Sequence, residues 1–230
     1  DEFLGIVYQV LEVGLSRDDA VGDLDGLRPL VGAPGGDTAR VSSVHTIHRV
    51  DSGLVRVSGG KYTTYRLMAR DAVDYVLAGE DPMPASRTHE RPLLGAAPRE
   101  RLAMLAAELA QETGLDGTRM EALVGRHGEG ARDVVDLGRA ADLLRPLSDD
   151  RTELEAEVAW AVEQEHALGL DDVLSRRMRL AMSRRDRGAS LAARVAEIVG
   201  ARLGWDAQQQ AAEVEQYLRS AHREYDVPGA

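Results

Sequence analysis

The segment best suited to chemistry is GGKYTTYR, Gly59–Arg66, which follows the run SGLVRVS. We read it as a strand that ends in two glycines and turns into a helix. Such a turn places Lys61 and several backbone N–H groups at a helix N-terminus, where partial positive charge collects. Lys61 is also the only lysine among the 28 Lys and Arg residues of the chain. The segment therefore suits an anion or an electron-rich ring.

Two β-prone runs and one amphipathic helix would position this segment. Val41–Val50 and Leu54–Ser58 are separated by Asp51-Ser52-Gly53, and this pattern predicts a β-hairpin. From Thr63 to about Gly79, apolar residues recur at helical spacing and predict a helix with one apolar face. Strand, glycine turn and helix form the clearest β-to-α unit in the chain.

A second candidate for anion binding is Arg28, in the string GLRPLVG. A residue before proline is held in an extended backbone, so its guanidinium is presented at a fixed angle. With Arg40 and Lys61 it forms an anion-handling set, in which a phosphate near Arg28 and Lys61 would accept charge-assisted hydrogen bonds. On spacing alone, a surface salt bridge is the simpler interpretation of Arg28. Around these residues we predict a helix over 3–13 and a loop over 32–39.

The rest of the chain reads as helical. Residues 79–98 contain four prolines and no periodicity, which predicts a linker between a part at 1–78 and a helical domain at 99–230. The expected fold class is mostly α with a small β part (α+β). Residue types that favour helix termini predict helix starts and stops at the following positions: Pro98, Gly114, Thr152, Asp171, Ser190, Gly204, Asp206 and about Tyr225.

Composition argues against several classes of protein. The formal net charge of −11 argues against a nucleic-acid binder. The absence of cysteine excludes disulfides and thiolate metal sites and fits a cytoplasmic protein. No apolar run approaches the roughly 18 residues of a membrane span. His45 and His48 lie three apart on a predicted strand and point to opposite faces, so we expect no metal site.

The chain also lacks a GxGxxG dinucleotide motif, and it starts at Asp1 with no initiator Met. We therefore expect it to be a piece of a longer protein, and not a self-contained dinucleotide domain.

Arginines gather in one part of the acidic second half. The cluster consists of Arg176, Arg177, Arg179, Arg184, Arg185 and Arg187. One interpretation pairs them with acids of a neighbouring helix, namely Glu153, Glu155, Glu157, Glu163 and Glu165. The alternative is a patch that meets anionic lipid head groups.

Three strings together resemble a known family. GLRPLVG, TARVSSVH and SGLVRVSGGKYTTYRLMARDAVD resemble the last part of the flavin domain of FAD-dependent, quinone-linked glycerol-3-phosphate dehydrogenases. LEAEVAWAVEQEHALGLDDVLSRRMRLAM is similar to the helical C-terminal domain of the same enzymes, including its DVLxRR signature. The resemblance covers nearly the whole chain, and it implies a strand–helix remnant of a flavin-binding domain followed by an all-helical domain.

The resemblance implies roles for individual residues. Arg28 corresponds to the arginine that binds the substrate phosphate, and Lys61 to the lysine close to substrate and flavin. Gly59 and Gly60 correspond to the start of the segment that wraps the isoalloxazine. That segment continues through Tyr62, Thr63 and Thr64. The family commonly has an arginine where this chain has Ser43, and we expect Arg40 to supply that charge, with Arg49 as the alternative.

The resemblance also implies a reaction and its partners. The complete enzyme would oxidise glycerol 3-phosphate to dihydroxyacetone phosphate and pass electrons through FAD to a membrane quinone. We expect these 230 residues alone neither to hold FAD tightly nor to turn over. A cytoplasmic location, peripheral contact with the inner face of the plasma membrane and a homodimer fit this family. Two alternatives stay open: a non-catalytic helical module for interaction or membrane apposition, and a related flavoprotein that oxidises an amine or amino acid.

Overall fold

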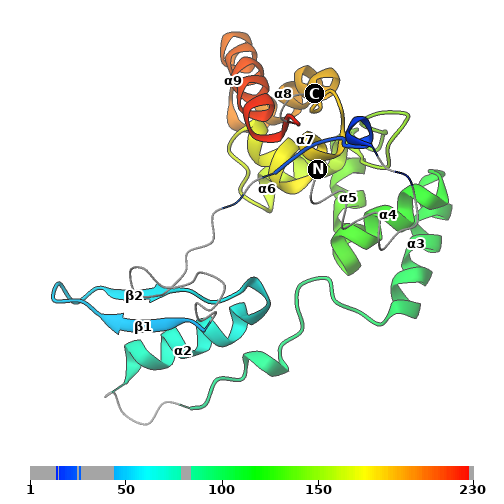
Figure 1. Ribbon diagram of the computed structural model, residues 1–230. Helices are drawn as coiled ribbons and strands as arrows, with labels where there is room; N and C mark the ends of the chain where they lie inside the picture. The colour runs from blue at the N-terminus through cyan, green and yellow to red at the C-terminus, as the bar shows by residue number, and fades with distance from the viewer. Residues whose placement is uncertain (1–13, 15, 25, 27–43, 79–83, 228–230) are drawn as a thin grey trace. The chain divides into compact units, whose positions relative to one another are not determined.

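The computed structural model describes residues 14, 16–24, 26, 44–78 and 84–227 (Figure 1). The chain divides into two compact units, a hairpin–helix unit (Gly26–Leu93) and a helical unit (Asp1–Asp25 with Leu94–Ala230). Among the described residues, the sheet has two strands and all other regular elements are helical. The predicted fold class, mostly α with a small β part, is therefore confirmed. The domain limits at residues 78 and 98 stay a prediction.

Several predictions fall outside the described residues. These are the helix over 3–13, the loop over 32–39, and the side chains of Arg28, Arg40 and Ser43.

The predicted hairpin is present. β1 (Thr46–Arg49) and β2 (Val55–Ser58) pair antiparallel, with the first residue of β1 opposite the last of β2. In the turn, Gly53 N donates to Val50 O at 2.8 Å. Gly53 has a φ of 85°, a backbone conformation that glycine adopts without the steric cost of a Cβ. The Asp-Ser-Gly signal therefore identified the hairpin correctly.

The predicted amphipathic helix is α2 (Tyr65–Leu77), preceded by the 3-10 turn η3 (Tyr62–Thr64). It runs along the hairpin in Figure 1, and its Tyr75 hydroxyl accepts a hydrogen bond from Arg49 N at 3.0 Å. No residue of α2 is fully buried, and Val73 is 54% exposed. The apolar side chains of this unit are therefore only partly buried. An isolated two-stranded hairpin is only marginally stable in water.

The helical unit is built from helices that pack on one another in pairs. Its helices are α3 (Arg99–Thr113), α4 (Gly117–His127), α5 (Ala131–Ala140), α6 (Glu155–Glu163), α7 (Leu180–Ser183), α8 (Ala189–Leu203) and α9 (Ala207–Tyr225). Short turns η1 (Arg17–Asp19), η4 (Thr88–Glu90, in the other unit) and η5 (Gly128–Gly130) are 3-10, and Asp172–Arg177 (η6) is a π-helix. α3 packs on α4, and α6 packs on both α5 and α8.

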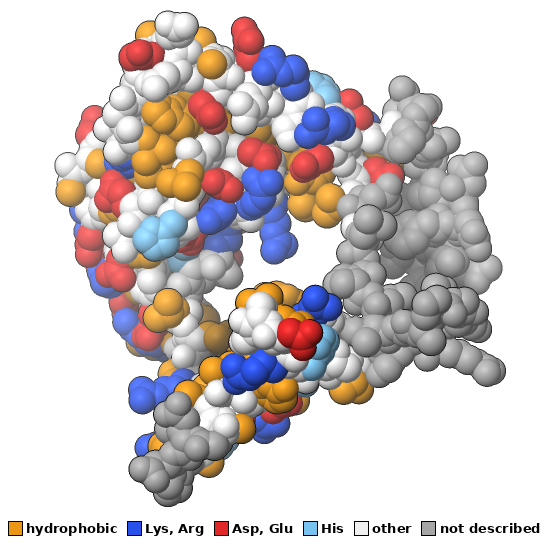
Figure 2. Space-filling model, turned by 90° about the vertical axis from the view of Figure 1, so that its left-hand side faces the viewer, with side chains coloured by type: hydrophobic (Ala, Val, Ile, Leu, Met, Phe, Trp, Pro, Cys, Tyr) orange, Lys and Arg blue, Asp and Glu red, His pale blue; other side chains and the backbone are white. Residues whose placement is uncertain are grey.

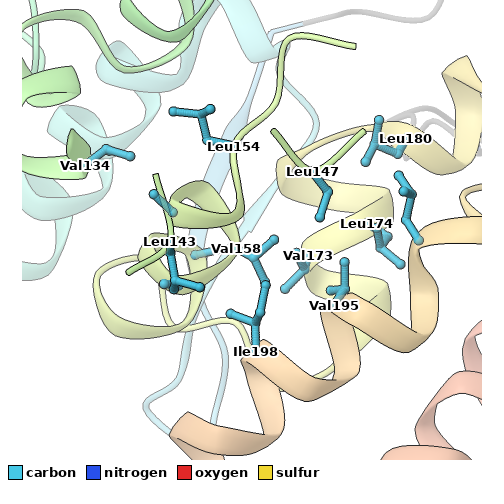
Figure 3. Packing of buried hydrophobic residues seen from close by; sticks show 14 of the residues in the cluster. Val134, Leu143, Leu147, Leu154, Val158, Val173, Leu174, Leu180, Val195 and Ile198 are labelled. Carbon is cyan, nitrogen blue, oxygen red and sulfur yellow. The ribbon is translucent and has the colours of Figure 1, made fainter. Parts of the chain in front are cut away.

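α6 lies at the centre of the hydrophobic core. Figure 3 shows Val158 of α6 among side chains from other elements, including Leu143, Val173 of η6 and Ile198 of α8. Val158 and Val173 are fully buried. Burying a side chain of this size contributes about 1.5–3 kcal/mol, so α6 and η6 are fixed mainly by packing.

Some predicted helix termini are confirmed. Asp206 caps α9, since its Oδ1 accepts from Gln209 N at 2.8 Å. Gly114 and Gly204 end α3 and α8 with φ values of 72° and 76°. α9 ends at Tyr225, as expected.

Three predicted caps are wrong, two of them because a nearby acid makes the capping hydrogen bond and one because its side chain bonds elsewhere. Thr152 does not cap α6; instead Glu157 Oε2 accepts from Leu154 N at 2.8 Å. Asp171 precedes η6 without capping it, and its Oδ1 accepts from the Ser175 hydroxyl at 2.6 Å. Ser190 lies inside α8.

The group that caps α8 is Asp186. Asp186 Oδ1 accepts from Gly188 N at 3.1 Å, and its Oδ2 accepts from both N and Oγ of Ser190. Burial raises the pKa of Asp186, but hydrogen bonds from Ser190 and then Arg184 outweigh burial and hold it well below its usual range. The carboxylate is therefore ionised wherever the protein is folded at ordinary pH.

The arginine cluster is mostly paired with acids, which supports the first interpretation, but the partners differ from those predicted. Arg184 binds Asp150 and Asp186, and Arg176 binds Asp171 and Asp172. Of the predicted glutamates, only Glu165 meets an arginine of the cluster, Arg177 at 4.0 Å. Glu153 pairs with Arg151, Glu155 with Arg145 and Arg194, Glu157 with Arg126, and Glu163 with Arg202. Accordingly, red and blue side chains intermingle over the visible face of this unit in Figure 2.

Gly125 lies inside α4 and Gly128 ends it, and alanine substitutions at the two positions should have opposite effects on stability. Gly128 has a φ of 59°, and a Cβ there would lie 2.0 Å from the carbonyl oxygen of Gly95. We expect Gly128→Ala to lower the free energy of unfolding by about 2 kcal/mol, because both the backbone conformation and the space disfavour alanine. Gly125 lies inside α4 with nothing within 4 Å of its added Cβ, so Gly125→Ala is expected to raise it by about 0.5–1 kcal/mol. Urea denaturation measures both, and equal effects of the two substitutions would show that the Gly95–Gly128 contact is absent.

Candidate functional site

The candidate site is the turn that joins β2 to α2. Gly59 and Gly60 have φ values of 77° and 87°, which redirect the chain at the end of β2. Lys61 then takes an extended conformation, with φ −129° and ψ 153°, and the helical turn η3 begins at Tyr62. The strand, glycine pair and helix of the sequence prediction are therefore present in that order.

Thr64 closes this turn on itself. Its hydroxyl donates to Lys61 O at 2.9 Å, and its Oγ1 accepts from Lys61 N at 3.2 Å. Thr64 N also donates to Lys61 O, at 2.9 Å. Three hydrogen bonds between the same two residues fix the backbone from which the lysine side chain extends.

Within the part of the chain that the structure describes, two N–H groups here have no acceptor, those of Tyr62 and Thr63. They lie at the N-terminal end of η3 and α2, where the partial charges of the backbone sum to a positive potential. Lys61 is exposed and forms no ion pair with a described residue. The ammonium group and the two N–H groups are thus available to an external acceptor.

An aromatic surface adjoins these donors. The rings of Tyr62 and Tyr65 lie 6.0 Å apart at an angle of 33°, and Tyr62 is 91% exposed. Tyr65 is 49% exposed, so both rings contribute to an exposed aromatic surface. Amide donors beside aromatic rings suit a planar, electron-rich group.

Gly60 lies where the hairpin packs on α2. A Cβ at Gly60 would lie 2.4 Å from the Met68 sulfur and 3.4 Å from His45 Cβ. His45 Nε2 lies 3.0 Å from Asp71 Oδ2, which ties the strand entry to α2. Arg70 and then His45 act against burial to lower the pKa of the Asp71 carboxyl. Sequence analysis missed this His45–Asp71 contact, because no short spacing joins residues 26 positions apart.

The structure therefore tests only part of the predicted site geometry. It brings together Gly59, Gly60, Lys61 and the Tyr62–Thr64 turn. The relation of Arg28 and Arg40 to Lys61 stays a prediction, as do the roles assigned to each residue. Arg49, the alternative to Arg40, donates its N–H to Tyr75 and its side chain to Gly53 O at 3.2 Å. Among the described residues, no group of His, Asp and Glu side chains could hold a metal ion.

Comparison with known proteins gives a family. Residues 86–210 match the family model described as the C-terminal domain of alpha-glycerophosphate oxidase. The chain belongs to this family. The matched region contains α3 to α8 and most of the helical unit, including η6, the DVLSRR segment. The resemblance drawn from the sequence is therefore confirmed.

Relatives of the alpha-glycerophosphate oxidase family extend the match to the hairpin–helix unit. Glycerol-3-phosphate dehydrogenase 2 of Mycobacterium tuberculosis (strain ATCC 25618 / H37Rv) is 37% identical over 229 residues, which cover 97% of this chain and 39% of the relative. Glycerol-3-phosphate dehydrogenase of Mycobacterium leprae (strain TN) is 38% identical over 219 residues, covering 94% of this chain and 37% of that protein. The mitochondrial glycerol-3-phosphate dehydrogenase of Bos taurus is 30% identical, covering 90% of this chain and 29% of the relative.

A solved structure shares the fold. The glycerol-3-phosphate dehydrogenase from Bacillus halodurans, complexed with FAD, matches with a TM-score of 0.66 and 22% sequence identity, over 78% of this chain and 37% of that one. At this identity the likeness concerns the fold. Although 97% of this chain is matched, the chain spans only 39% of the length of the Mycobacterium tuberculosis relative.

Proposed function

We propose that this chain is the C-terminal part of a flavin-dependent dehydrogenase that oxidises sn-glycerol 3-phosphate to dihydroxyacetone phosphate. The observation that carries the proposal is the conformation of GGKYTT, in a chain 37% identical to a glycerol-3-phosphate dehydrogenase over 97% of its length. The segment presents an ammonium and two N–H groups at a helix N-terminus, none of which has a partner among the described residues.

The residues of the turn fit FAD. An electron-rich ring edge needs donors that are not already occupied, and the N–H groups of Tyr62 and Thr63 meet this requirement. Close approach of a ring to the backbone needs residues without bulk, and Gly59 and Gly60 provide them. The chemistry that FAD supplies when bound is acceptance of the hydride from C2 of glycerol 3-phosphate.

The chain's own groups would bind and orient the flavin ring and the substrate phosphate. The helix N-terminus would offer positive potential to the negative charge that develops at the ring edge, and would stabilise that charge without reorganisation. Lys61 lies at the same end and would hold either the ring edge or the substrate phosphate by charge-assisted hydrogen bonds. We assign the phosphate chiefly to Arg28, with Arg40 and Lys61 beside it.

The exposed apolar surface of the hairpin–helix unit is consistent with a flavin site that this chain forms together with other polypeptide. Apolar side chains on both elements are exposed: Leu54, Val57, Tyr65, Val73 and Val76. We propose that residues 1–78 complete a flavin domain and that 99–230 form a separate helical domain, with 79–98 between them. The 230 residues alone should therefore neither retain FAD nor turn over.

The proposal extends to partners and location. We assign reoxidation to a membrane quinone, with the protein cytoplasmic and in peripheral contact with the inner face of the plasma membrane, and with a homodimer as its assembly. Among the described residues, no helix has the length and apolar character to cross a bilayer.

Absorbance spectroscopy tests the function. The complete protein should purify with a flavin band that bleaches anaerobically on addition of glycerol 3-phosphate, and should not bleach with glycerol. The chain of residues 1–230 should purify colourless. Bleaching by sarcosine or another amine, and not by glycerol 3-phosphate, would instead identify an amine-oxidising relative. A complete protein without flavin would overturn the proposal.

A further inference from the structure

The DVLSRR segment of the helical unit has an unusual backbone. Asp172–Arg177 forms a π-helix, and Arg179, two residues later, has φ 56° and ψ 26°. π-Helical turns are rare and occur frequently at functional sites. A left-handed conformation is uncommon for a residue with a Cβ, and it persists only where surrounding structure enforces it. These two irregularities direct Arg177 and Arg179 into one pocket.

That pocket, which we call the Arg179 pocket, has a volume of about 400 Å³. Arg177, Met178 and Arg179 form one wall, and Arg126 and His127 from the end of α4 form another. Three arginines and one histidine thus converge in a unit whose overall balance is acidic.

The two carboxylates in the Arg179 pocket each lie near a cation of the pocket wall. Glu157 is 4% exposed, and Arg126 donates to both of its oxygens, at 2.7 and 2.9 Å. His127 Nε2 lies 3.1 Å from the same carboxylate. Arg177 donates to the backbone oxygen of Glu165 at 2.8 Å, and its Nε lies 4.0 Å from the Glu165 carboxylate, which is 37% exposed. Glu157 is therefore paired with Arg126, and Glu165 has Arg177 as its cationic neighbour.

Arg179 differs from the other arginines of the cluster in its side-chain contacts. It is exposed, and its guanidinium makes no ion pair or hydrogen bond with any residue in the described ranges. The other five arginines of the cluster each bind an acid or a carbonyl oxygen. A guanidinium that has a costly backbone conformation and no partner in the described part of the chain can bind an external anion through two parallel N–H groups.

A second, less polar cavity adjoins the Arg179 pocket. Its volume is about 560 Å³, and it shares Arg126, His127 and Glu165 with the first. Trp160 and Leu94 also line it. The Trp160 ring meets the His127 ring edge-on, with centroids 6.3 Å apart. A ligand that reached from Arg179 into this cavity would meet an aromatic and an aliphatic surface.

We propose that the Arg179 pocket binds a phosphorylated small molecule. Its phosphate would contact the guanidinium groups of Arg179 and Arg177, and its less polar body would lie beside Trp160. Phosphate has the charge and the oxygen geometry that paired arginines recognise. A soluble ligand is favoured over a lipid head group because the cations line a pocket, and because four of the six arginines of the cluster are paired with acids.

Calorimetric titration with inorganic pyrophosphate tests the proposal. The protein should carry Lys61→Met, so that anion binding at the GGK segment does not contribute. Arg179→Gln should weaken pyrophosphate binding at least about tenfold, the loss expected for one charge-assisted contact. The matched control is Arg176→Gln, because Arg176 lies in the π-helix that precedes Arg179 but is paired with Asp171 and Asp172 and lines a different pocket.

A second variant separates binding from folding. Arg179→Gly removes the guanidinium while suiting the left-handed backbone, so it should lose pyrophosphate binding without lowering the midpoint of thermal unfolding. Absence of pyrophosphate binding by the parent protein would overturn the proposal, as would an equal loss in Arg176→Gln. Arg179-dependent binding to vesicles containing phosphatidic acid, with no binding of pyrophosphate, would assign the pocket to lipid instead.

Discussion

Replacing Lys61 by Met is expected to lower kcat/KM for glycerol 3-phosphate by about 1000-fold in the complete protein. Lys61 is exposed beside the N–H groups of Tyr62 and Thr63, and neither these groups nor the Lys61 ammonium has a partner among the described residues. Loss of one preorganised donor at a site of developing charge typically lowers turnover by about 100- to 1000-fold. Steady-state turnover with an artificial electron acceptor measures the effect.

Two further variants make the Lys61 result specific. Lys61→Arg keeps the charge but changes its shape and reach, so it should recover part of the activity. Arg56→Met removes an exposed cation from β2 of the same unit, where no described acid pairs with it, and should leave turnover within about twofold of the parent. If Lys61→Met behaved like Arg56→Met, Lys61 would have no part in the reaction.

Glu157→Gln is expected to lower the free energy of unfolding by about 3 kcal/mol at pH 7. Glu157 is 4% exposed and accepts hydrogen bonds from Leu154 N and from two side chains of α4. Removing its charge leaves Arg126 and His127 without their partner, and breaking a buried pair costs about 3–5 kcal/mol. The lower end applies because Arg126 is 29% exposed and regains some hydration.

The same substitution has a predicted pH dependence. Burial raises the pKa of Glu157, but hydrogen bonds from His127 and Arg126 outweigh burial and hold it below its ordinary value of 4.5. A lowered folded-state pKa contributes stability above the unfolded value, and that contribution is lost as the pH falls through the folded value. The difference in stability between the parent and Glu157→Gln should therefore be constant near neutrality and shrink below pH 4.5.

The control for burial is Glu163→Gln on the same helix. Glu163 is 41% exposed and pairs with Arg202 at 2.7 Å. An exposed pair contributes about 0–1 kcal/mol, so this variant should be close to the parent in denaturant titrations. Equal effects of the Glu157 and Glu163 substitutions would contradict the assigned role of the buried carboxylate.

Local patterns predicted the hairpin, α2 and the long C-terminal helices. Features that depend on residues within three or four positions can be read from the sequence. They are the turn at Gly53, the helix stops at Gly114 and Gly204, and the cap at Asp206. The predicted caps of α6 and α8 were wrong because each helix start has two candidate capping residues close in sequence. Glu157 takes the role predicted for Thr152, and Asp186 the role predicted for Ser190. Residue propensity alone does not decide between such candidates.

Nonlocal features could not be predicted. Glu155 was expected to pair with the arginine cluster and instead binds Arg194, 39 positions away, because α6 packs on α8. The π-helix at DVLSRR and the left-handed Arg179 follow from packing against the core, and their sequence carries no glycine to signal them. At the candidate site, residue types identified the turn, but the free N–H groups became evident only from its geometry.

The midpoint potential of the bound flavin tests the central claim most directly, namely that Lys61 and the adjoining helix N-terminus lie against the electron-rich edge of the ring. A nearby positive charge favours the reduced, anionic form. The complete protein carrying Lys61→Met should therefore show a midpoint potential lower by tens of millivolts, and Lys61→Arg a smaller shift. An unchanged potential in Lys61→Met, in a protein that retains its flavin, would contradict the account.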